Sequence, residues 1–206
     1  MKKKNEIKFV IGIDEVGRGA LAGPVSVCAV RFPVSKFRAI RRELAGIRDS
    51  KKLSAAARSD FSNKIKKLKR DGTLEFAVNY ISADVIDRQG IARAISRALR
   101  SALYRVSKDI KKVDIEVLLD GGLYAPNSFP YQRTLIHGDD TELPISIASV
   151  FAKHRRDQMM IRLGKQYPIY NFGQNKGYGT LAHRRVIRRR GISPIHRRSF
   201  CSDATA

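Results

Sequence analysis

Four acidic side chains stand at or just beyond the carboxyl ends of segments with strand character. Asp14 and Glu15 follow one apolar run, Asp120 ends a second, and Asp139 lies just past a third. In an α/β sheet such strand ends meet along one edge, so we expect the carboxylates to gather there. Clustered acids repel one another unless a cation offsets them, and oxygen donors without cysteine or histidine favour Mg²⁺ or Mn²⁺. One such acid alone is an ordinary turn residue, but the set predicts a metal site.

A glycine-rich turn made of Gly17, Arg18 and Gly19 follows the first acid pair. Glycine on both sides of the arginine lets the backbone approach a ligand closely. Adjacent strand residues point to opposite faces, so Asp14 and Glu15 can serve one site only if the strand ends or bulges there, which Gly17 would allow. The turn therefore predicts close backbone contact with whatever binds beside the acids.

The charge balance is strongly basic. Lys and Arg number 41 against 19 Asp and Glu, a formal net charge of +22 over 206 residues. This excess favours nucleic acid as a partner over an anionic membrane or a surface that is only solvated. The run at residues 9–13 stops at Asp14 and is too short to span a membrane. Cys28 and Cys201 lack metal-ligand spacing and fit a reducing compartment, so we expect a cytoplasmic protein with no membrane partner.

Hydrophobic periodicity predicts strands that alternate with helices. The strands are expected at residues 9–13, 25–32, 74–81, 115–122 and 133–138. The helices are expected from the capping residue Ser54 to near Gly72, from Ser82 through an apolar face at residues 91–102, and at residues 145–163. This alternation indicates an α/β fold with a mixed sheet.

Ordered motifs cover nearly the whole chain. They are GIDEVGRGALAGPV (12–25), DSKKLS (49–54), LLDG (118–121), HGDD (137–140), ISIASVFAKHRRD (145–157), NKGYGTLAH (175–183) and GISPIHRRSF (191–200). In this order the sequence resembles the type 2 ribonucleases H, specifically the ribonuclease HII family. The resemblance implies a ribonuclease H-like α/β fold, with a central mixed five-stranded sheet flanked by helices. It also implies one catalytic unit over residues 1–206, with a helical, basic C-terminal extension at roughly 165–206.

The resemblance also implies an activity. Members of the family hydrolyse the RNA strand of RNA/DNA hybrids and cut 5′ to ribonucleotides embedded in duplex DNA. Two-metal-ion catalysis with Mg²⁺ or Mn²⁺ leaves 5′-phosphate and 3′-hydroxyl ends. For this chain the resemblance therefore implies a monomeric endonuclease that binds such duplexes and removes misincorporated ribonucleotides and RNA primers.

The metal ligands are also implied by the resemblance. Asp14, Glu15 and Asp120 match the family's catalytic acids, and the fourth is Asp139, which follows the glycine of the HGDD motif. Asp14 and Asp120 would be shared between two ions, with Glu15 and Asp139 on the flanks. All four are therefore expected to be both metal-binding and catalytic.

The fourth acid has alternatives in the sequence. Asp140 is the ligand if the motif is shifted by one residue. Asp157 belongs to the later predicted helix and is treated as a supporting or structural acid. The choice between them stays open at the level of sequence.

Substrate contacts follow from the same resemblance. The turn at residues 17–19 would offer backbone N–H and C=O groups to the 2′-hydroxyl that separates RNA from DNA, while its arginine reaches a phosphate. Tyr178, framed by glycines, would stack on a sugar or base, and the nearby Lys176 would also bind the substrate. Ser50 and Lys51 would line the substrate groove.

Arginine runs mark the end of the chain. They would follow the phosphates of a duplex, or simply form a solvated face. The runs are Arg184 and Arg185, Arg188 to Arg190, and Arg197 and Arg198.

Two other functions fit part of the sequence. Another nuclease of the same fold, such as a Holliday-junction resolvase, would have the acids but not the glycine–arginine–glycine turn. A non-catalytic basic RNA-binding protein, such as a ribosomal component, would have the charge but scattered acids. The turn and the acids are both in place here, which favours the ribonuclease.

Overall fold

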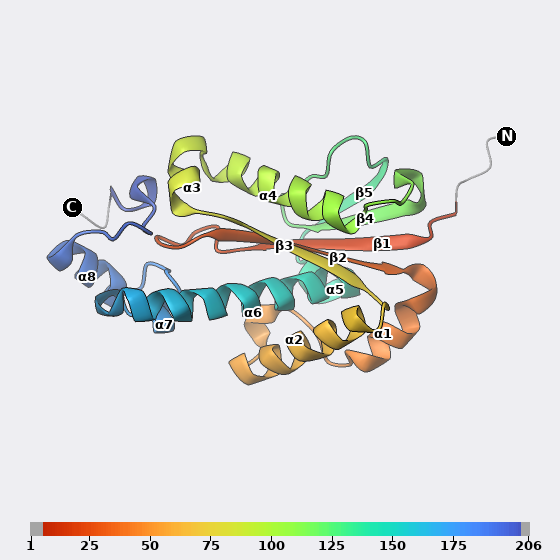
Figure 1. Cartoon of the computed structure of the whole chain (residues 1–206), viewed down its shortest axis with the longest axis horizontal. Helices are drawn as coiled ribbons and strands as arrows, with labels where there is room; N and C mark the ends of the chain where they lie inside the picture. The colour runs from red at the N-terminus through yellow and green to blue at the C-terminus, as the bar shows by residue number, and fades with distance from the viewer. Residues whose placement is uncertain (1–5, 203–206) are drawn as a thin grey trace.

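Five strands form one mixed sheet in the computed structural model, which describes residues 6–202 (Figure 1). The strands are β1 (Phe9–Val16), β2 (Val25–Pro33), β3 (Glu75–Ile81), β4 (Ile115–Asp120) and β5 (Tyr131–Leu135). Their order across the sheet is β3-β2-β1-β4-β5. β1 pairs antiparallel with β2 and parallel with β4, which confirms the predicted mixed five-stranded sheet.

Two strands depart from their expected bounds. β1 runs on through Val16 in regular pairing with β2, past its expected end at residue 13. β5 starts earlier than expected, at Tyr131, and ends at Leu135 because the chain turns there into the short helix α5 (Gly138–Thr141). His137 makes this turn in the left-handed region, with φ of +56°. The turn brings the acids of the HGDD motif back toward the end of β4.

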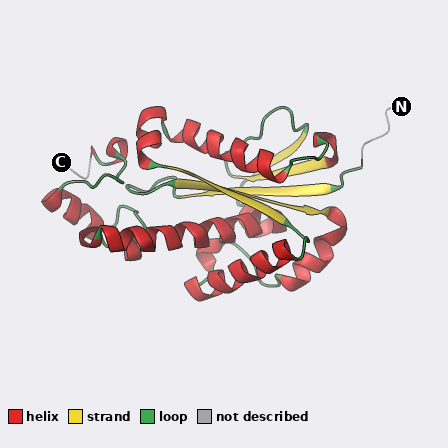
Figure 2. Ribbon diagram, viewed as in Figure 1, coloured by secondary structure: helices red, strands yellow, loops and turns green. Residues whose placement is uncertain are grey.

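Helices cover both faces of the sheet (Figures 1 and 2). One face carries α3 (Ala83–Gln89) and α4 (Ile91–Val106), which pack over a core of aliphatic residues from the sheet. A single helix was expected after Ser82. It is interrupted because Gly90, between the two helices, has φ of +79°, a conformation that helical residues do not adopt.

The other face carries α1 (Phe37–Glu43), α2 (Ala55–Arg70) and the long α6 (Leu143–Gln166). Ser54 caps α2 as predicted, because its hydroxyl accepts the Ala57 N–H at 3.1 Å. α6 lies directly on β1: a Cβ at Gly12 would overlap the backbone carbonyl of Pro144. Short 3₁₀ turns lie at Val34–Lys36, Ser50–Lys52, Lys112–Asp114, Pro168–Tyr170 and Arg198–Phe200.

The C-terminal elements dock against the far end of α6 (Figure 1). They include α7 (Phe172–Asn175) and α8 (Leu181–Arg190). Their apolar cluster also takes in the residues that follow the glycine-rich turn. Its buried members are Leu21, Ala22, Met160, Tyr170, Phe172, Ile187 and Cys201. The C-terminal segment is therefore packed against the start of the chain rather than on the sheet.

Neither cysteine is in a disulfide. Cys28 in β2 and Cys201 near the C-terminus are both buried, and they belong to different apolar clusters. Within residues 6–202, no helix has the length and apolar character needed to cross a membrane.

Two buried histidines link α8 to the last segment. The Ser193 N–H donates to His196 Nδ1 at 2.9 Å, so the neutral ring carries its proton on Nε2. That nitrogen lies 3.0 Å from His183 Nε2, and His183 Nδ1 lies 2.9 Å from the Tyr178 carbonyl oxygen. The hydrogen bonds therefore run in one direction, from Ser193 through both rings to the backbone of Tyr178. Burial, and then the charge of His183, lowers the pKa of His196 to about 4, and burial also lowers the pKa of His183.

This pair predicts a loss of stability in mild acid. The unfolded chain takes up a proton near the ordinary histidine pKa, whereas folded His196 stays neutral until about pH 4. The free energy of unfolding should therefore fall by about 2 kcal/mol between pH 7 and pH 5 through this residue. Urea unfolding at both pH values measures it. Replacing both His183 and His196 by Gln should reduce this change of the free energy of unfolding with pH, while the control substitution of the exposed His137 by Gln should not. An equal change in the unaltered protein and in both variants would rule out the histidine pair as the cause.

Candidate active site

Three carboxylates meet where β1 and β4 separate. The parallel pairing of these strands ends at Ile13 and Leu119, so Asp14 and Asp120 follow side by side. Asp139, in the first turn of α5, completes the group, and one oxygen from each acid lies within 4.8 Å of the others. The predicted gathering of acids at this edge is therefore observed for three of the four residues.

Asp14 is buried, with 7% of its surface exposed. Its Oδ1 accepts the Glu15 N–H at 2.7 Å. Burial raises its pKa well above the ordinary aspartate value; the Ser149 hydroxyl opposes the shift, and the charges of Asp120 and Glu15 add to it. The fold therefore places a carboxylate where its ionised form is costly unless a cation is present.

Asp139 is also buried, and its ionised form is also costly. Burial, followed by the charges of Asp120 and Asp49, raises its pKa to about 6, and Lys51 partly offsets the shift. Lys51 Nζ lies 3.9 Å from its Oδ2. The Asp120 carboxylate accepts the Gly138 N–H at 2.9 Å, which fixes the start of α5 next to the end of β4. Asp120 therefore fixes the turn that carries Asp139, the third acid of the cluster.

Glu15 lies at the edge of this group. It faces the same cavity as Asp14 but is not one of the three closely spaced acids, and its Oε1 lies 3.4 Å from Arg18 Nη1. The expectation that β1 ends or bulges at Asp14 is wrong, because pairing with β2 stays regular through Val16. Neighbouring side chains on a regular strand diverge, which places Glu15 at the edge of the cluster rather than within it.

The alternative acids lie elsewhere. Asp140 is exposed and forms an ion pair with Lys52. Asp157 lies on α6 and is paired with Lys153 at 2.9 Å and Arg58 at 3.6 Å. Neither belongs to the group of closely spaced carboxylates, so the geometry favours Asp139 as the fourth acid.

A cavity of about 500 Å³ opens beside the cluster. Asp14, Glu15 and Asp120 line it together with Ser50, Lys51 and Tyr178. The half-buried Tyr178 ring lies near two cations, with its centroid 5.6 Å from Lys153 Nζ and 5.4 Å from Arg156 Cζ. Six residues expected from the sequence to bind metal or substrate therefore line a single cavity.

Lys176 is placed differently from the expectation. Its ammonium group donates to the Gly173 carbonyl, and Lys176 is not among the residues that line the cavity. Its backbone is in the left-handed region, with φ of +53°, which directs the side chain back over α7. Lys176 contributes its carbonyl oxygen instead, which accepts a hydrogen bond from Arg156 Nη1 at 2.9 Å.

The glycine-rich turn directly follows Val16, which lines the cavity, and two buried arginines pack against it. Gly17 is buried with φ of +88°, and a Cβ there would overlap the Arg156 side chain, so glycine is required. Arg18 and Gly19 are exposed. The carbonyl oxygens of Gly17 and Arg18 accept hydrogen bonds from Arg197 at 2.7 and 2.8 Å.

The expectation that Arg197 follows duplex phosphates is wrong. Its side chain is fully buried because the C-terminal segment folds over the glycine-rich turn. Arg156 is equally buried and was not expected at the site. A sequence signal for it exists, since Arg156 continues the buried four-residue spacing of Ala148 and Ala152 along α6.

The mixed sheet, its helical layers and the carboxylates at the ends of β1 and β4 define a metal-dependent nuclease of the ribonuclease H fold. A solved structure, ribonuclease H2 from Pyrococcus horikoshii OT3, shares this fold with a TM-score of 0.72 and 20% sequence identity, covering 95% of this chain and 96% of that chain.

Sequence comparison identifies the family. The model of the family described as Ribonuclease HII matches residues 11–203. Ribonuclease HII of Chlorobium luteolum is 41% identical over 95% of this chain and 90% of its own length. Ribonuclease HII of Bacillus mycoides is 40% identical over 97% of this chain and 73% of its own length. The chain therefore belongs to the ribonuclease HII family, whose members are divalent-metal-dependent endonucleases.

The carboxylate cluster predicts opposite effects of one substitution with and without metal. At neutral pH the Asp14 carboxyl destabilises the metal-free fold, because its folded pKa lies above its unfolded value. Asp14→Asn should raise the free energy of unfolding in EDTA by about 1–2 kcal/mol. The same variant should lose the rise in melting temperature that Mg²⁺ or Mn²⁺ gives the unaltered protein.

The matched control is Asp140→Asn, an acid one residue from the cluster that pairs with Lys52 instead. Thermal unfolding of the three proteins in EDTA and in 5–10 mM metal (about the level that saturates a weak site) makes the comparison. A metal-dependent rise that persists in Asp14→Asn, or disappears in Asp140→Asn, would contradict the assignment.

Proposed function

We propose that this protein hydrolyses the RNA strand of RNA/DNA hybrids and cuts 5′ to ribonucleotides embedded in duplex DNA, leaving 5′-phosphate and 3′-hydroxyl ends. The supporting observation is that the acid pair Asp14 and Asp120 lines the same cavity as Tyr178. Acids suited to phosphate chemistry thus share a cavity with an aromatic ring suited to a sugar or base. Such an enzyme would act as a cytoplasmic monomer in the removal of misincorporated ribonucleotides and RNA primers.

The donor set fits divalent metal. Three carboxylate groups lie within 4.8 Å of one another, and burial together with mutual repulsion raises the pKa of two of them. Oxygen-only donors suit Mg²⁺ or Mn²⁺. Asp14 and Asp120 would hold two ions jointly, with Glu15 and Asp139 on the flanks. When bound, the ions activate water, neutralise the phosphoryl oxygens and stabilise the leaving 3′ oxygen.

The glycine-rich turn and the remaining cavity residues would bind and orient the duplex. The exposed Arg18 and Gly19 would place their backbone N–H groups at the 2′-hydroxyl. Tyr178 would stack on the adjacent sugar, with its ring held by the nearby cations Lys153 and Arg156. Ser50 and Lys51 line the same cavity, and the largely exposed ammonium of Lys51 can meet a phosphate near the acids.

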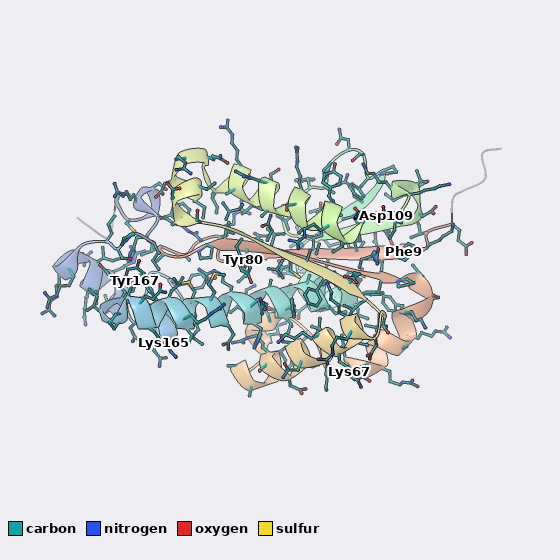
Figure 3. All side chains as sticks on the ribbon, viewed as in Figure 1. Phe9, Lys67, Tyr80, Asp109, Lys165 and Tyr167 are labelled. Carbon is teal, nitrogen blue, oxygen red and sulfur yellow. The ribbon has the colours of Figure 1, made fainter. Side chains whose placement is uncertain are left out.

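Long-range attraction would come from the basic surface. The formal charge is +22, and exposed cations are spread over the helices; Figure 3 labels Lys67 on α2 and Lys165 on α6 among them. On α8, Arg188, Arg189 and Arg190 form an exposed run. Charge of this kind raises affinity for any duplex, and selection of ribonucleotides would then fall to the cavity.

Cleavage of a DNA duplex with a single ribonucleotide is the direct test. The unaltered protein in Mg²⁺ or Mn²⁺ should nick only the ribonucleotide-containing strand, on its 5′ side. Asp120→Asn should reduce the rate by about a thousandfold or more while duplex binding is kept or strengthened, because removing the charge removes a ligand and also repulsion toward phosphate. Full cleavage by the folded variant would overturn the proposed ligand set.

The same assay separates the proposed function from its alternatives. Cleavage of a four-way DNA junction but not of the ribonucleotide duplex would indicate a resolvase. Binding to RNA without cleavage of any substrate would indicate a non-catalytic RNA-binding protein.

Tyr178 gives a separate prediction. If its ring stacks on the sugar next to the cut bond, Tyr178→Ala should lose about 10- to 100-fold in kcat/KM, whereas Tyr178→Phe should lose little, since a stacking contact contributes about 1–3 kcal/mol. The loss should be larger on the single-ribonucleotide duplex than on a continuous hybrid, where other registers can supply a 2′-hydroxyl. Equal losses in both variants would show that the hydroxyl matters rather than the ring.

A further inference from the structure

Arg197 is a buried cation without an acidic partner. Its side chain is fully inaccessible, and among residues 6–202 it forms no ion pair. Burial and the nearby charge of Arg156 lower its pKa to about 10. An unpaired buried charge costs several kcal/mol, so something specific must compensate for it. The compensation consists of three hydrogen bonds to carbonyl oxygens, all from residues 17–23.

Two of these carbonyls belong to consecutive residues. Arg197 Nη2 donates to the Gly17 oxygen at 2.7 Å and Nη1 donates to the Arg18 oxygen at 2.8 Å. In a planar trans peptide the C=O and the following N–H point in opposite directions. Holding these two carbonyls inward therefore turns the N–H groups of Arg18 and Gly19 outward, at the two exposed positions of the turn.

The fork geometry of arginine suits this task. A guanidinium is planar and presents parallel donors to two acceptors at once, whereas a lysine ammonium is a point charge on a flexible stem. The third donor, Nε, donates to the Gly23 oxygen at 3.1 Å and thereby connects the turn to the segment that follows it. The backbone around Arg197 is also fixed, since its N–H donates to the Leu21 oxygen at 2.8 Å.

We propose that Arg197 is a positioning residue for ribose recognition: by binding the carbonyls of Gly17 and Arg18, it aims the amides of Arg18 and Gly19 at the 2′-hydroxyl of the substrate. This inference rests on the proposed function of the turn. It assigns part of the discrimination between RNA and DNA to a C-terminal residue that does not itself touch the substrate.

The test compares binding of two duplexes that differ in one 2′-hydroxyl. Arg197→Gln and Arg197→Lys are made in the cleavage-deficient Asp120→Asn protein, together with the control Arg70→Gln, an exposed arginine at the end of α2. Affinity is measured for an all-DNA duplex and for the same duplex with one ribonucleotide. Losing one well-aimed hydrogen bond should reduce the preference for the ribonucleotide duplex by about tenfold in Arg197→Gln, with Arg197→Lys intermediate and Arg70→Gln unchanged.

The readout is the ratio of the two affinities, which a purely structural role would not change. Thermal unfolding confirms that each variant is folded; if Arg197→Gln is not, Arg197→Lys decides, since it keeps the charge but cannot hold both carbonyls. A lower melting temperature with an unchanged ratio would overturn the proposal and leave the proposed function intact. No ribonucleotide preference in the Asp120→Asn protein itself would instead overturn the role of the turn, and with it this inference.

Discussion

Repulsion between carboxylates at the parallel edge of β1 and β4 is the constraint on which the site depends. β-strand pairing places Asp14 beside Asp120, and the Asp120 carboxylate in turn fixes the start of α5 and hence Asp139. The fold thus encloses like charges that lie close together, and burial, followed by their mutual repulsion, raises the pKa of Asp14 and of Asp139. The packing around these acids is stable enough to bear this cost, and a divalent cation would remove it. In this account, the arrangement that destabilises the metal-free protein is the same one that binds the ions.

A second set of buried charges holds the substrate side of the cavity. Both arginines are satisfied by backbone carbonyls instead of by acids: Arg197 by those of the glycine-rich turn, and Arg156 by those of Ala22 and Pro24 just after it. Because carbonyls rather than carboxylates satisfy these arginines, no additional acid is needed beside the surface that is proposed to bind phosphate. The hydrogen bonding also joins distant parts of the sequence, because Arg156 reaches the carbonyl of Lys176, two residues before Tyr178, while the histidine pair reaches the carbonyl of Tyr178 itself. The turn and the tyrosine are therefore fixed with respect to each other by the C-terminal segment.

Much of this arrangement could be predicted from the sequence, and the limits have physical causes. Runs of β-branched residues predict the strands, and acids at the ends of these runs predict the carboxylate cluster, because both features depend on residue type. The position of Asp139 depends on a left-handed turn at His137, and residue type alone does not specify such a turn. The prediction of Asp139 as a site residue came instead from its place in the HGDD motif. The sequence predicts Arg197 on the surface because arginine is usually exposed. Its hydrogen-bond partners are backbone carbonyls, which cannot be recognised from residue types. The regular continuation of β1 through Val16, which turns Glu15 aside, depended on pairing with β2 and so on the tertiary fold.

Proton release on metal binding tests the central claim most directly. If the clustered acids hold the ions, carboxyls with raised pKa must lose protons as Mn²⁺ or Mg²⁺ enters, and Asp139 with its pKa of about 6 is half protonated at pH 6. Calorimetric titration of the full chain with Mn²⁺ in two buffers of different ionisation enthalpy gives the number of protons released. The account predicts measurable release at pH 6 that is smaller at pH 8, where Asp139 is already ionised. Tight binding without any release at pH 6, or no binding at either pH, would contradict it.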